Sequence, residues 1–469
     1  MAAAGSDDSS RLFSNYSSHQ KIYPRAVAGR FAQLRWAAVF FTQLIYYGLP
    51  WVQWNGRQAI LFDLGARKFY LFGVVLWPQD FVYLALLLVV AALSLFFFTA
   101  LAGRLWCGFA CPQTVYTELF MWIERKVEGD RLKRIKLDAA PLDLKKLRKK
   151  ATKHLLWGAL ALWTGLTFIG YFAPIRELGV QIASLSLGPW QWFWWLFYSF
   201  ATWGNAGFMR EQVCKYMCPY ARFQSAMFDK DTMIVTYDQS RGEPRGSRSR
   251  KTAPASVGLG DCIDCTLCVQ VCPTGIDIRQ GLQYECIGCA ACIDVCDDVM
   301  AKMNYPPGLI RFSTGNAVAL HLDGRQTLRR AIRPRVLIYG GLLAGLLLAL
   351  IGSMWLRSPL NVDVIRDRYA LARVADDGSI ENTYRLQLMN ASETPLSLQV
   401  EVAGIDTIRL SGNGRFDVPP ATNRVVPVSV HVNQEAGRPG SNPITFLIRE
   451  TTPDGLSHEE KAVFLVPRQ

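Results

Sequence analysis

Eight of the twelve cysteines stand in two runs that share one spacing. In bacterial ferredoxins this spacing holds two cubane iron–sulfur clusters, and the fourth cysteine of each run ligates the cluster of the other run. The first run is Cys262-x-x-Cys265-x-x-Cys268-x-x-x-Cys272-Pro273, and the second is Cys286-x-x-Cys289-x-x-Cys292-x-x-x-Cys296. We therefore predict two [4Fe-4S] clusters, one bound by Cys262, Cys265, Cys268 and Cys296 and the other by Cys286, Cys289, Cys292 and Cys272.

Two details of these runs bear on that prediction. Four thiolates also suit zinc, but zinc motifs do not usually carry the interleaved run twice. Asp297 stands where the second run would usually have proline, and this difference leaves every ligand in place. The runs therefore predict electron transfer as the chemistry of this part of the chain.

The other four cysteines form two pairs with a shared pattern. The pairs are Cys107-Gly-Phe-Ala-Cys111-Pro112 and Cys214-Lys-Tyr-Met-Cys218-Pro219, and each follows two apolar segments. We interpret them as an internal duplication. If each pair lies on a helix, its thiols share a face about 6 Å apart, so each pair could hold a metal ion or form a disulfide. If the two units pack side by side, four thiolates converge.

Soft sulfur ligands such as these select Cu(I), zinc or iron–sulfur centres. A site that prefers Cu(I) over Cu(II) also favours the reduction of copper. The alternative interpretation is that the pairs are inert buried thiols. The duplicated spacing beside a redox domain favours a metal-handling role.

Apolar segments of membrane-spanning length, about 20 residues each, surround these motifs. The second and fifth segments are nearly unbroken, whereas the other three contain polar residues such as Gln43, Thr164 and Asn205. Buried core helices are the alternative for those three. The predicted spans are residues 36–54, 81–102, 154–173, 190–209 and 336–356.

The net charge of +13 is concentrated in residues 103–153 and 210–335. Basic loops stay on the cytoplasmic side of a membrane, which predicts an inner-membrane protein with its N-terminus and ferredoxin domain in the cytoplasm and its C-terminal domain in the periplasm. Contact with anionic lipid explains the basic segments without nucleic acid. Every cysteine then lies on or next to the reducing side, and residues 357–469 contain none, as expected where no disulfides form.

These signals predict a multi-domain membrane protein. Its fold would combine an α-helical bundle of about five transmembrane helices, a bacterial-type double 4Fe-4S ferredoxin domain of the α+β class, and a C-terminal all-β Ig-like sandwich, since short β-rich runs alternate with turn signals there. The predicted divisions are a cytoplasmic N-terminal segment (1–35), a first membrane hairpin (36–102), the first cysteine motif with a basic amphipathic segment (103–153), a second hairpin (154–209), the second cysteine motif (210–238), a flexible linker (239–260), the ferredoxin domain (261–310), a basic connector (311–335), a fifth span (336–356) and the Ig-like domain (357–469).

With these motifs in place, the chain resembles the membrane polyferredoxins, a group that includes the quinol-oxidising subunit of periplasmic nitrate reductase. The fifth span and the exported β domain make it similar, from about Tyr23 onward, to the CcoG (FixG/RdxA) family of cytochrome c oxidase accessory proteins. The resemblance implies a cupric reductase that supplies Cu(I) for the assembly of cbb-type oxidase. It also implies that Cys107, Cys111, Cys214 and Cys218 are the catalytic, copper-handling residues and that the ferredoxin cysteines supply electrons.

The expected partners are a cytoplasmic electron donor, a copper chaperone or transporter, and membrane lipid. Two other functions remain open. One is a quinol dehydrogenase that passes electrons to a periplasmic reductase, although the haem-attachment motif Cys-x-x-Cys-His is absent from the sequence. The other is a non-enzymatic assembly scaffold that senses redox state through its clusters.

Overall fold

The computed structural model describes residues 21–252, 257–367, 372–375, 377–452 and 455–467. Two compact units make up the chain. The first contains Met1–Tyr46, Ala91–Phe168 and Gly188–Leu343, and the second contains Tyr47–Val90, Ile169–Leu187 and Ala344–Gln469. The first twenty residues of the predicted N-terminal segment lie outside the described part.

Each predicted span contains a long helix. These helices are α1 (Arg30–Gly48), α2 (Phe81–Ala102), α6 (Leu144–Ile169), α8 (Pro189–Gly204) and α15 (Pro334–Trp355). Among the described residues, two helices are long and apolar enough to cross a membrane, Pro78–Ala102 and Pro334–Trp355. The bundle of five spanning helices therefore stays a prediction.

A small β insertion follows α1 and precedes α2. Helix α1 ends at Gly48, before the predicted span ends, because Pro50 lacks the N–H that a continuing helix needs. The insertion consists of β1 (Gln53–Trp54), β2 (Arg57–Gln58), β3 (Ile60–Asp63), β4 (Lys68–Leu71) and β5 (Val74–Leu76), with β3, β4 and β5 forming one antiparallel sheet. Another part of the same unit is the short helix α7 (Ile175–Ala183).

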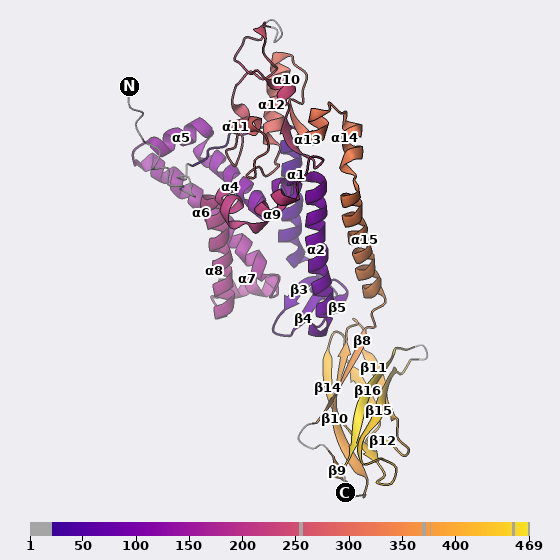
Figure 1. The fold of residues 1–469 in the computed structure, drawn as a ribbon. Helices are drawn as coiled ribbons and strands as arrows, with labels where there is room; N and C mark the ends of the chain where they lie inside the picture. Colours follow the sequence, from indigo (N-terminus) through magenta and orange to yellow (C-terminus); the bar gives the residue numbers. More distant parts are fainter. Residues whose placement is uncertain (1–20, 253–256, 368–371, 376, 453–454, 468–469) are drawn as a thin grey trace, which may run out of the picture. The chain divides into compact units, whose positions relative to one another are not determined.

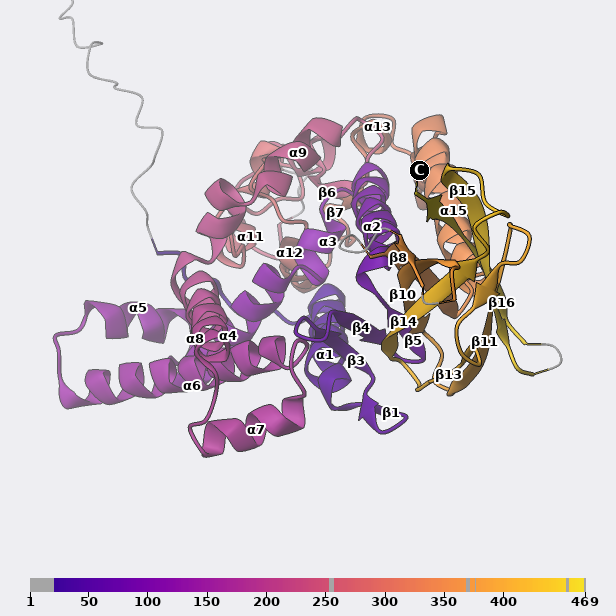
Figure 2. The same cartoon turned by 90° about the horizontal axis from the view of Figure 1, so that it is seen from below.

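The C-terminal part of the second unit is an all-β sandwich, as predicted (Figures 1 and 2). One sheet has the order β12-β14-β10-β8 with β9 at its side, and the other has the order β13-β11-β15-β16. Alternating apolar side chains such as Leu386, Leu398 and Phe446 are fully buried between the sheets. The strands are β8 (Leu360–Arg366), β9 (Arg373–Val374), β10 (Ile380–Asn390), β11 (Leu396–Ala403), β12 (Arg409–Leu410), β13 (Arg415–Val418), β14 (Asn423–Val432), β15 (Gly440–Glu450) and β16 (Ser457–Val466).

The ferredoxin fold belongs to the first unit and extends beyond the predicted range of 261–310. Strand β6 (Ile234–Tyr237) pairs with β7 (Ile310–Ser313), so the segment before the linker contributes a strand. Between the strands lie α10 (Gln239–Gly242), α11 (Leu267–Gln270), the 3₁₀ turn Ile278–Gln280 and α12 (Ala291–Met303). The connector that follows forms α13 (Gly315–Ala319) and α14 (Gly324–Ala331).

The described part of the predicted linker is held against the ferredoxin fold. Arg241 forms an ion pair with Asp261 at 2.6 Å. Arg248 donates to the carbonyl of Gly260 at 2.6 Å and to the hydroxyl of Tyr305 at 3.0 Å. Residues 239–252 of the predicted flexible linker are thus tied to the ferredoxin fold through their arginines, and residues 253–256 lie outside the described part.

The remaining helices of the first unit contain members of the two cysteine pairs or follow the pairs along the chain. The first pair is followed by α4 (Pro112–Glu128) and α5 (Arg131–Ala139), and α5 lies beside the start of α6 (Figure 2), where Lys150 and Asp138 form an ion pair at 2.5 Å. The elements at the pairs themselves are α3 (Leu105–Phe109), two π-helical turns (Asn205–Met209 and Val213–Met217) and α9 (Pro219–Met227).

Candidate functional site

Two cavities in the ferredoxin fold are each lined by four predicted cluster ligands. The first set, which we define as Cys262, Cys265, Cys268 and Cys296, lines one cavity. The second set, defined as Cys272, Cys286, Cys289 and Cys292, lines the other cavity, and Cys268 lines it as well. The structure therefore brings together the fourth cysteine of each run with the first three of the other.

The two runs bend around these cavities in the same way. In the first run Asp264 and Thr266 have φ values of 52° and 55°, and in the second run Gly288 and Ala290 have φ values of 68° and 60°. These residues occupy matching positions, two and four after the first cysteine of each run. A left-handed conformation is uncommon for residues other than glycine, so its repetition indicates that the closely spaced cysteines require it to point at one centre.

The donor set fits an iron–sulfur cluster. Burial raises the pKa of Cys268 to about 11 and those of Cys289 and Cys296 to about 12. Because only the thiolate binds metal, these buried sulfur atoms need a positive centre to ionise, and cluster iron supplies one. Apolar side chains such as Val299 and Leu309 complete the wall of the first cavity.

The remaining cysteines, which we call the motif thiols (Cys107, Cys111, Cys214 and Cys218), do not lie in pairs on single helices as predicted. Cys107 is in α3, but Cys111 has extended backbone angles and precedes α4. Cys214 is in a π-helical turn, but Cys218 is likewise extended and precedes α9. The proline after each second cysteine explains this, because proline starts a helix well and disfavours a helical residue before it.

The motif thiols nevertheless come together from both motifs. The Cys107 thiol donates to Gln224 in α9, the helix that Cys218 precedes, at 3.3 Å. Burial, together with neighbouring motif thiols, raises the pKa of Cys107 to about 11 and that of Cys214 to about 12. All twelve cysteines are free. Within the described residues, no three His, Cys, Asp or Glu side chains are close enough to hold one metal ion.

The first motif touches the loop that carries the second set. A Cβ atom added at Gly108 would lie 2.8 Å from the carbonyl oxygen of Gly288, so only glycine allows this approach. Arg104, which is 5% exposed, donates to the backbone carbonyls of Ala221, Tyr284 and Cys286. This arginine therefore joins α9 and the second ferredoxin run to the start of the first motif.

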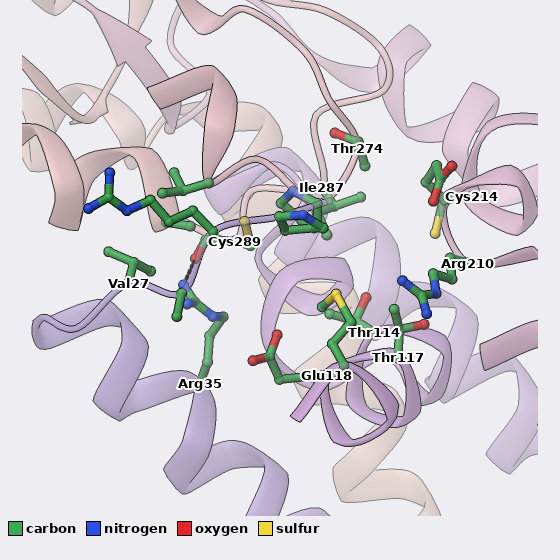
Figure 3. A pocket seen from close by; sticks show the side chains of 18 of the residues that line it. Val27, Arg35, Thr114, Thr117, Glu118, Arg210, Cys214, Thr274, Ile287 and Cys289 are labelled. Atoms are coloured by element: carbon green, nitrogen blue, oxygen red, sulfur yellow. Dashed lines mark hydrogen bonds between the residues drawn. The ribbon is translucent and has the colours of Figure 1, made fainter. Parts of the chain in front are cut away.

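A cavity of about 200 Å³ separates one motif thiol from the second set (Figure 3). Cys214 lines one side and Cys289 the other, and Arg35 donates to the Cys289 carbonyl. Polar side chains including Thr114, Glu118 and Arg210 complete the wall. The sequence does not reveal this cavity, since its walls come from α1, α4, the second motif and the ferredoxin fold.

A buried ion cluster holds the two motifs in place and was not predicted. Glu124 of α4 is 0% exposed and accepts from Arg134 and Arg210, each at 3.0 Å. Burial alone would raise the pKa of Glu124, but Arg210, Arg134 and Lys153 hold it below its usual value. Because Arg210 lies between the two π-helical turns, this pair ties the second motif to the helix that follows the first.

Comparison with known protein families gives matches to three regions of the chain. Residues 209–315 match a 4Fe-4S dicluster domain, residues 84–128 match a 4Fe-4S binding domain, and residues 350–467 match the Ig-like fold at the C-terminus of FixG. The nitrogen fixation protein FixG of Rhizobium meliloti is 39% identical over 90% of this chain and 88% of its own length.

Two further relatives come from Cereibacter sphaeroides. Protein RdxB is 42% identical over 89% of this chain and 88% of its own length, and protein RdxA is 39% identical over 92% of each. Among solved structures, a FixG-related protein from Vibrio parahaemolyticus is 23% identical, with 23% of this chain and 97% of that chain covered and a TM-score of 0.22.

Proposed function

Because this chain belongs to the FixG/RdxA family and is an iron–sulfur electron-transfer protein, we propose that it reduces Cu(II) to Cu(I) for the assembly of cbb-type cytochrome c oxidase. The observation that carries the proposal is the contact between Gly108 and Gly288. It puts the loop of the second set directly against the motif that contains Cys107 and Cys111.

In this proposal the first and second sets hold two 4Fe-4S clusters, which supply one electron at a time when bound. The motif thiols bind the substrate copper. Each Cu(II) takes up one electron from a cluster and becomes Cu(I), and a motif thiol that binds copper as a thiolate releases its proton. Thiolate sulfur favours the product because soft ligands select Cu(I).

The cavity between Cys214 and Cys289 gives copper a place to reach the motif thiols. Its wall contains a thiol, the Met121 thioether and the carboxylates of Glu118 and Glu211. Oxygen and sulfur donors thus lie within one cavity. This mixed set suits an ion that arrives as Cu(II) and leaves as Cu(I).

The proposed setting is the inner membrane, with the N-terminus and the ferredoxin fold in the cytoplasm, where an electron donor reduces the clusters. The Ig-like domain would then lie in the periplasm. It offers a surface for a copper chaperone or transporter, and the basic segments would contact anionic lipid.

The test uses purified protein under anaerobic conditions. The clusters are reduced, excess reductant is removed, Cu(II) is added, and cluster reoxidation is followed together with capture of Cu(I) by a chromogenic chelator. We expect stoichiometric Cu(I) from the natural protein and at least about tenfold slower production from Cys214→Ala/Cys218→Ala, because a soft-ligand site is lost. Met217→Leu, between the same cysteines, serves as the matched control.

A quinol dehydrogenase is the second candidate, and one cavity favours it. This cavity, of about 290 Å³, is lined by Lys153, His154, Trp157 and Phe208. The rings of His154 and Phe208 stack with centroids 5.7 Å apart, so the walls suit a planar ring. Reoxidation of the clusters by quinone, with copper ignored, would establish this function instead. For a non-enzymatic scaffold that senses redox state, variants without cluster ligands would still support oxidase assembly under reducing conditions with ample copper.

A further inference from the structure

The charges beside the second set are positive and lack carboxylate partners. Arg104 is buried and donates to the carbonyls of Tyr284 and Cys286, and Arg35 donates to the carbonyl of Cys289 (Figure 3). In the described part of the chain, neither guanidinium forms an ion pair with a carboxylate. Both arginines are bound only to backbone oxygens.

A buried cation without a countercharge is unfavourable. Carbonyl dipoles offset part of this cost. Arg104 and Arg35 bind the backbone of two cysteines of the second set, so the thiolates of that set are negative groups beside these arginines. The arrangement therefore suits a negatively charged cluster at the second set, and it would stabilise an additional electron there.

Beside the first set, carboxylates outnumber cations. Arg279 lines its cavity, but its guanidinium forms ion pairs with both Asp264 at 2.5 Å and Asp277 at 2.7 Å. The two carboxylates thus more than neutralise the single positive charge of Arg279. A third carboxylate, Asp297, follows Cys296 directly and accepts from the backbone N–H of Gly308 at 2.8 Å. One further cation, Arg248, donates to the carbonyl of Cys262 at 3.4 Å, so two cations face three carboxylates and the net charge beside the first set stays negative.

Four carboxylates near the second set do not reverse its charge balance. Glu118 and Glu211 line the cavity beside Arg35, but Glu118 forms an ion pair with Arg125 at 3.2 Å and Arg210 lines the same cavity as Glu211. Asp294 of α12 accepts from the backbone N–H groups of Phe31 and Ala32, at the positive end of the α1 dipole. Glu285 precedes Cys286 and is partly exposed, so water screens its charge more than that of the buried Arg104. The difference between the two sets therefore remains.

We propose that the cluster held by the second set has the higher reduction potential, so that electrons arrive at the first set and leave from the second toward the motif thiols. Reduction of a cluster adds one electron and one negative charge, with no proton. Arg35 and Arg104 favour that added charge at the second set, whereas Asp264, Asp277 and Asp297 disfavour it at the first.

The exposure of the ligands agrees with this direction. Cys265 of the first set is exposed, which offers a surface to a one-electron donor protein. The loop of the second set is the one that meets Gly108. Electrons would thus move from an exposed cysteine to a buried contact beside Cys107, toward the higher reduction potential that the charged side chains create at the second set.

The test is a redox titration with dithionite, followed by electron paramagnetic resonance, on the full-length protein without copper. We expect two potentials. In Cys265→Ala, which loses a ligand of the first set, the remaining unaltered signal should be the one with the higher potential. Arg35→Gln should lower only the higher potential, by about tenfold in the equilibrium constant, which is about 59 mV for a one-electron couple.

Several variants keep the test decisive. Arg35→Lys retains the charge and should change the potential less than Arg35→Gln, and Asp277→Asn should raise only the lower potential. Arg325→Gln removes an exposed charge of α14 and should change neither. One common potential for both clusters, or a shift of the lower potential in Arg35→Gln, would overturn the proposal. Since the inference rests on the proposed ligand sets but needs no copper, its failure is distinguishable from failure of copper reduction.

Discussion

The ferredoxin sets and the motif thiols are both groups of four cysteines, but they are assembled differently. Each ferredoxin set comes from loops and short helices within residues 262–296, and its cavity is lined, besides the cysteines, mainly by apolar side chains. The motif thiols come from two distant motifs, and Cys214 opens onto a cavity that charged and apolar side chains both line. This difference teaches that a resident cofactor needs an enclosed, locally built site, whereas a substrate ion needs access.

Loss of a ferredoxin ligand should have the largest effect. We expect Cys289→Ser to lose most of the iron of one cluster and to destabilise the fold, because metal binding energy is also folding energy at such sites. Iron and sulfide analysis with thermal unfolding measures both. The matched control is Cys218→Ser, which should keep its full iron content. Equal iron loss in the control would mean that the motif thiols also hold a resident cluster, and the comparison would fail.

The positions of the motif thiols should depend on the buried ion pairs of Glu124, whereas the positions of the ferredoxin cysteines should not. Glu124→Gln leaves Arg134 and Arg210 buried without their shared carboxylate, and breaking a buried pair in this way costs about 3–5 kcal/mol. We expect faster alkylation of Cys214 and unchanged iron content, both measured by mass spectrometry of the native protein. Glu118→Gln removes a partly exposed ion pair with Arg125 and should have a much smaller effect.

The contact between the first cysteine motif and the loop of the second set can be weakened by a single methyl group at Gly108. In Gly108→Ala the new methyl group would meet the Gly288 carbonyl at 2.8 Å, so the loops must separate. We expect about tenfold slower Cu(I) production, since small misplacements at reacting centres are costly, with both potentials retained. Gly158→Ala places its methyl group in open space and should react like the natural protein. A normal rate in Gly108→Ala would show that this contact does not carry the electron.

The smallest effect is expected in the Ig-like domain, which contains no cysteine. A hydrogen bond from Arg373 lowers the pKa of Glu381 from 4.5 to about 2. Because the folded-state pKa is the lower one, this contribution to stability is present above pH 4.5 and is lost as the pH falls toward 2. Limited proteolysis of the domain across this range should show the loss, and Glu381→Gln should weaken the pH dependence. The exposed Glu401→Gln should leave it unchanged.

Local patterns predicted much of the molecule. The cysteine spacing predicted which side chains share each ferredoxin cavity, because closely spaced cysteines can face only one centre. Short β-rich runs separated by turn signals in residues 357–469 predicted the sandwich. The prediction that each Cys-x-x-x-Cys pair lies on one helix was wrong, although Pro112 and Pro219 could have shown that a helix begins after the second cysteine.

The sequence by itself determined the donor atoms: two interleaved thiol sets, two further pairs, and a β domain without cysteine. Only the tertiary structure decided which of these groups meet. The contact of Gly108 with Gly288, the pairing of Glu124 with Arg210 and the cavity between Cys214 and Cys289 join residues far apart in the chain. Spacing along the chain specifies ligands within one loop, but contacts between loops depend on how helices pack, and that follows from side chains throughout the unit.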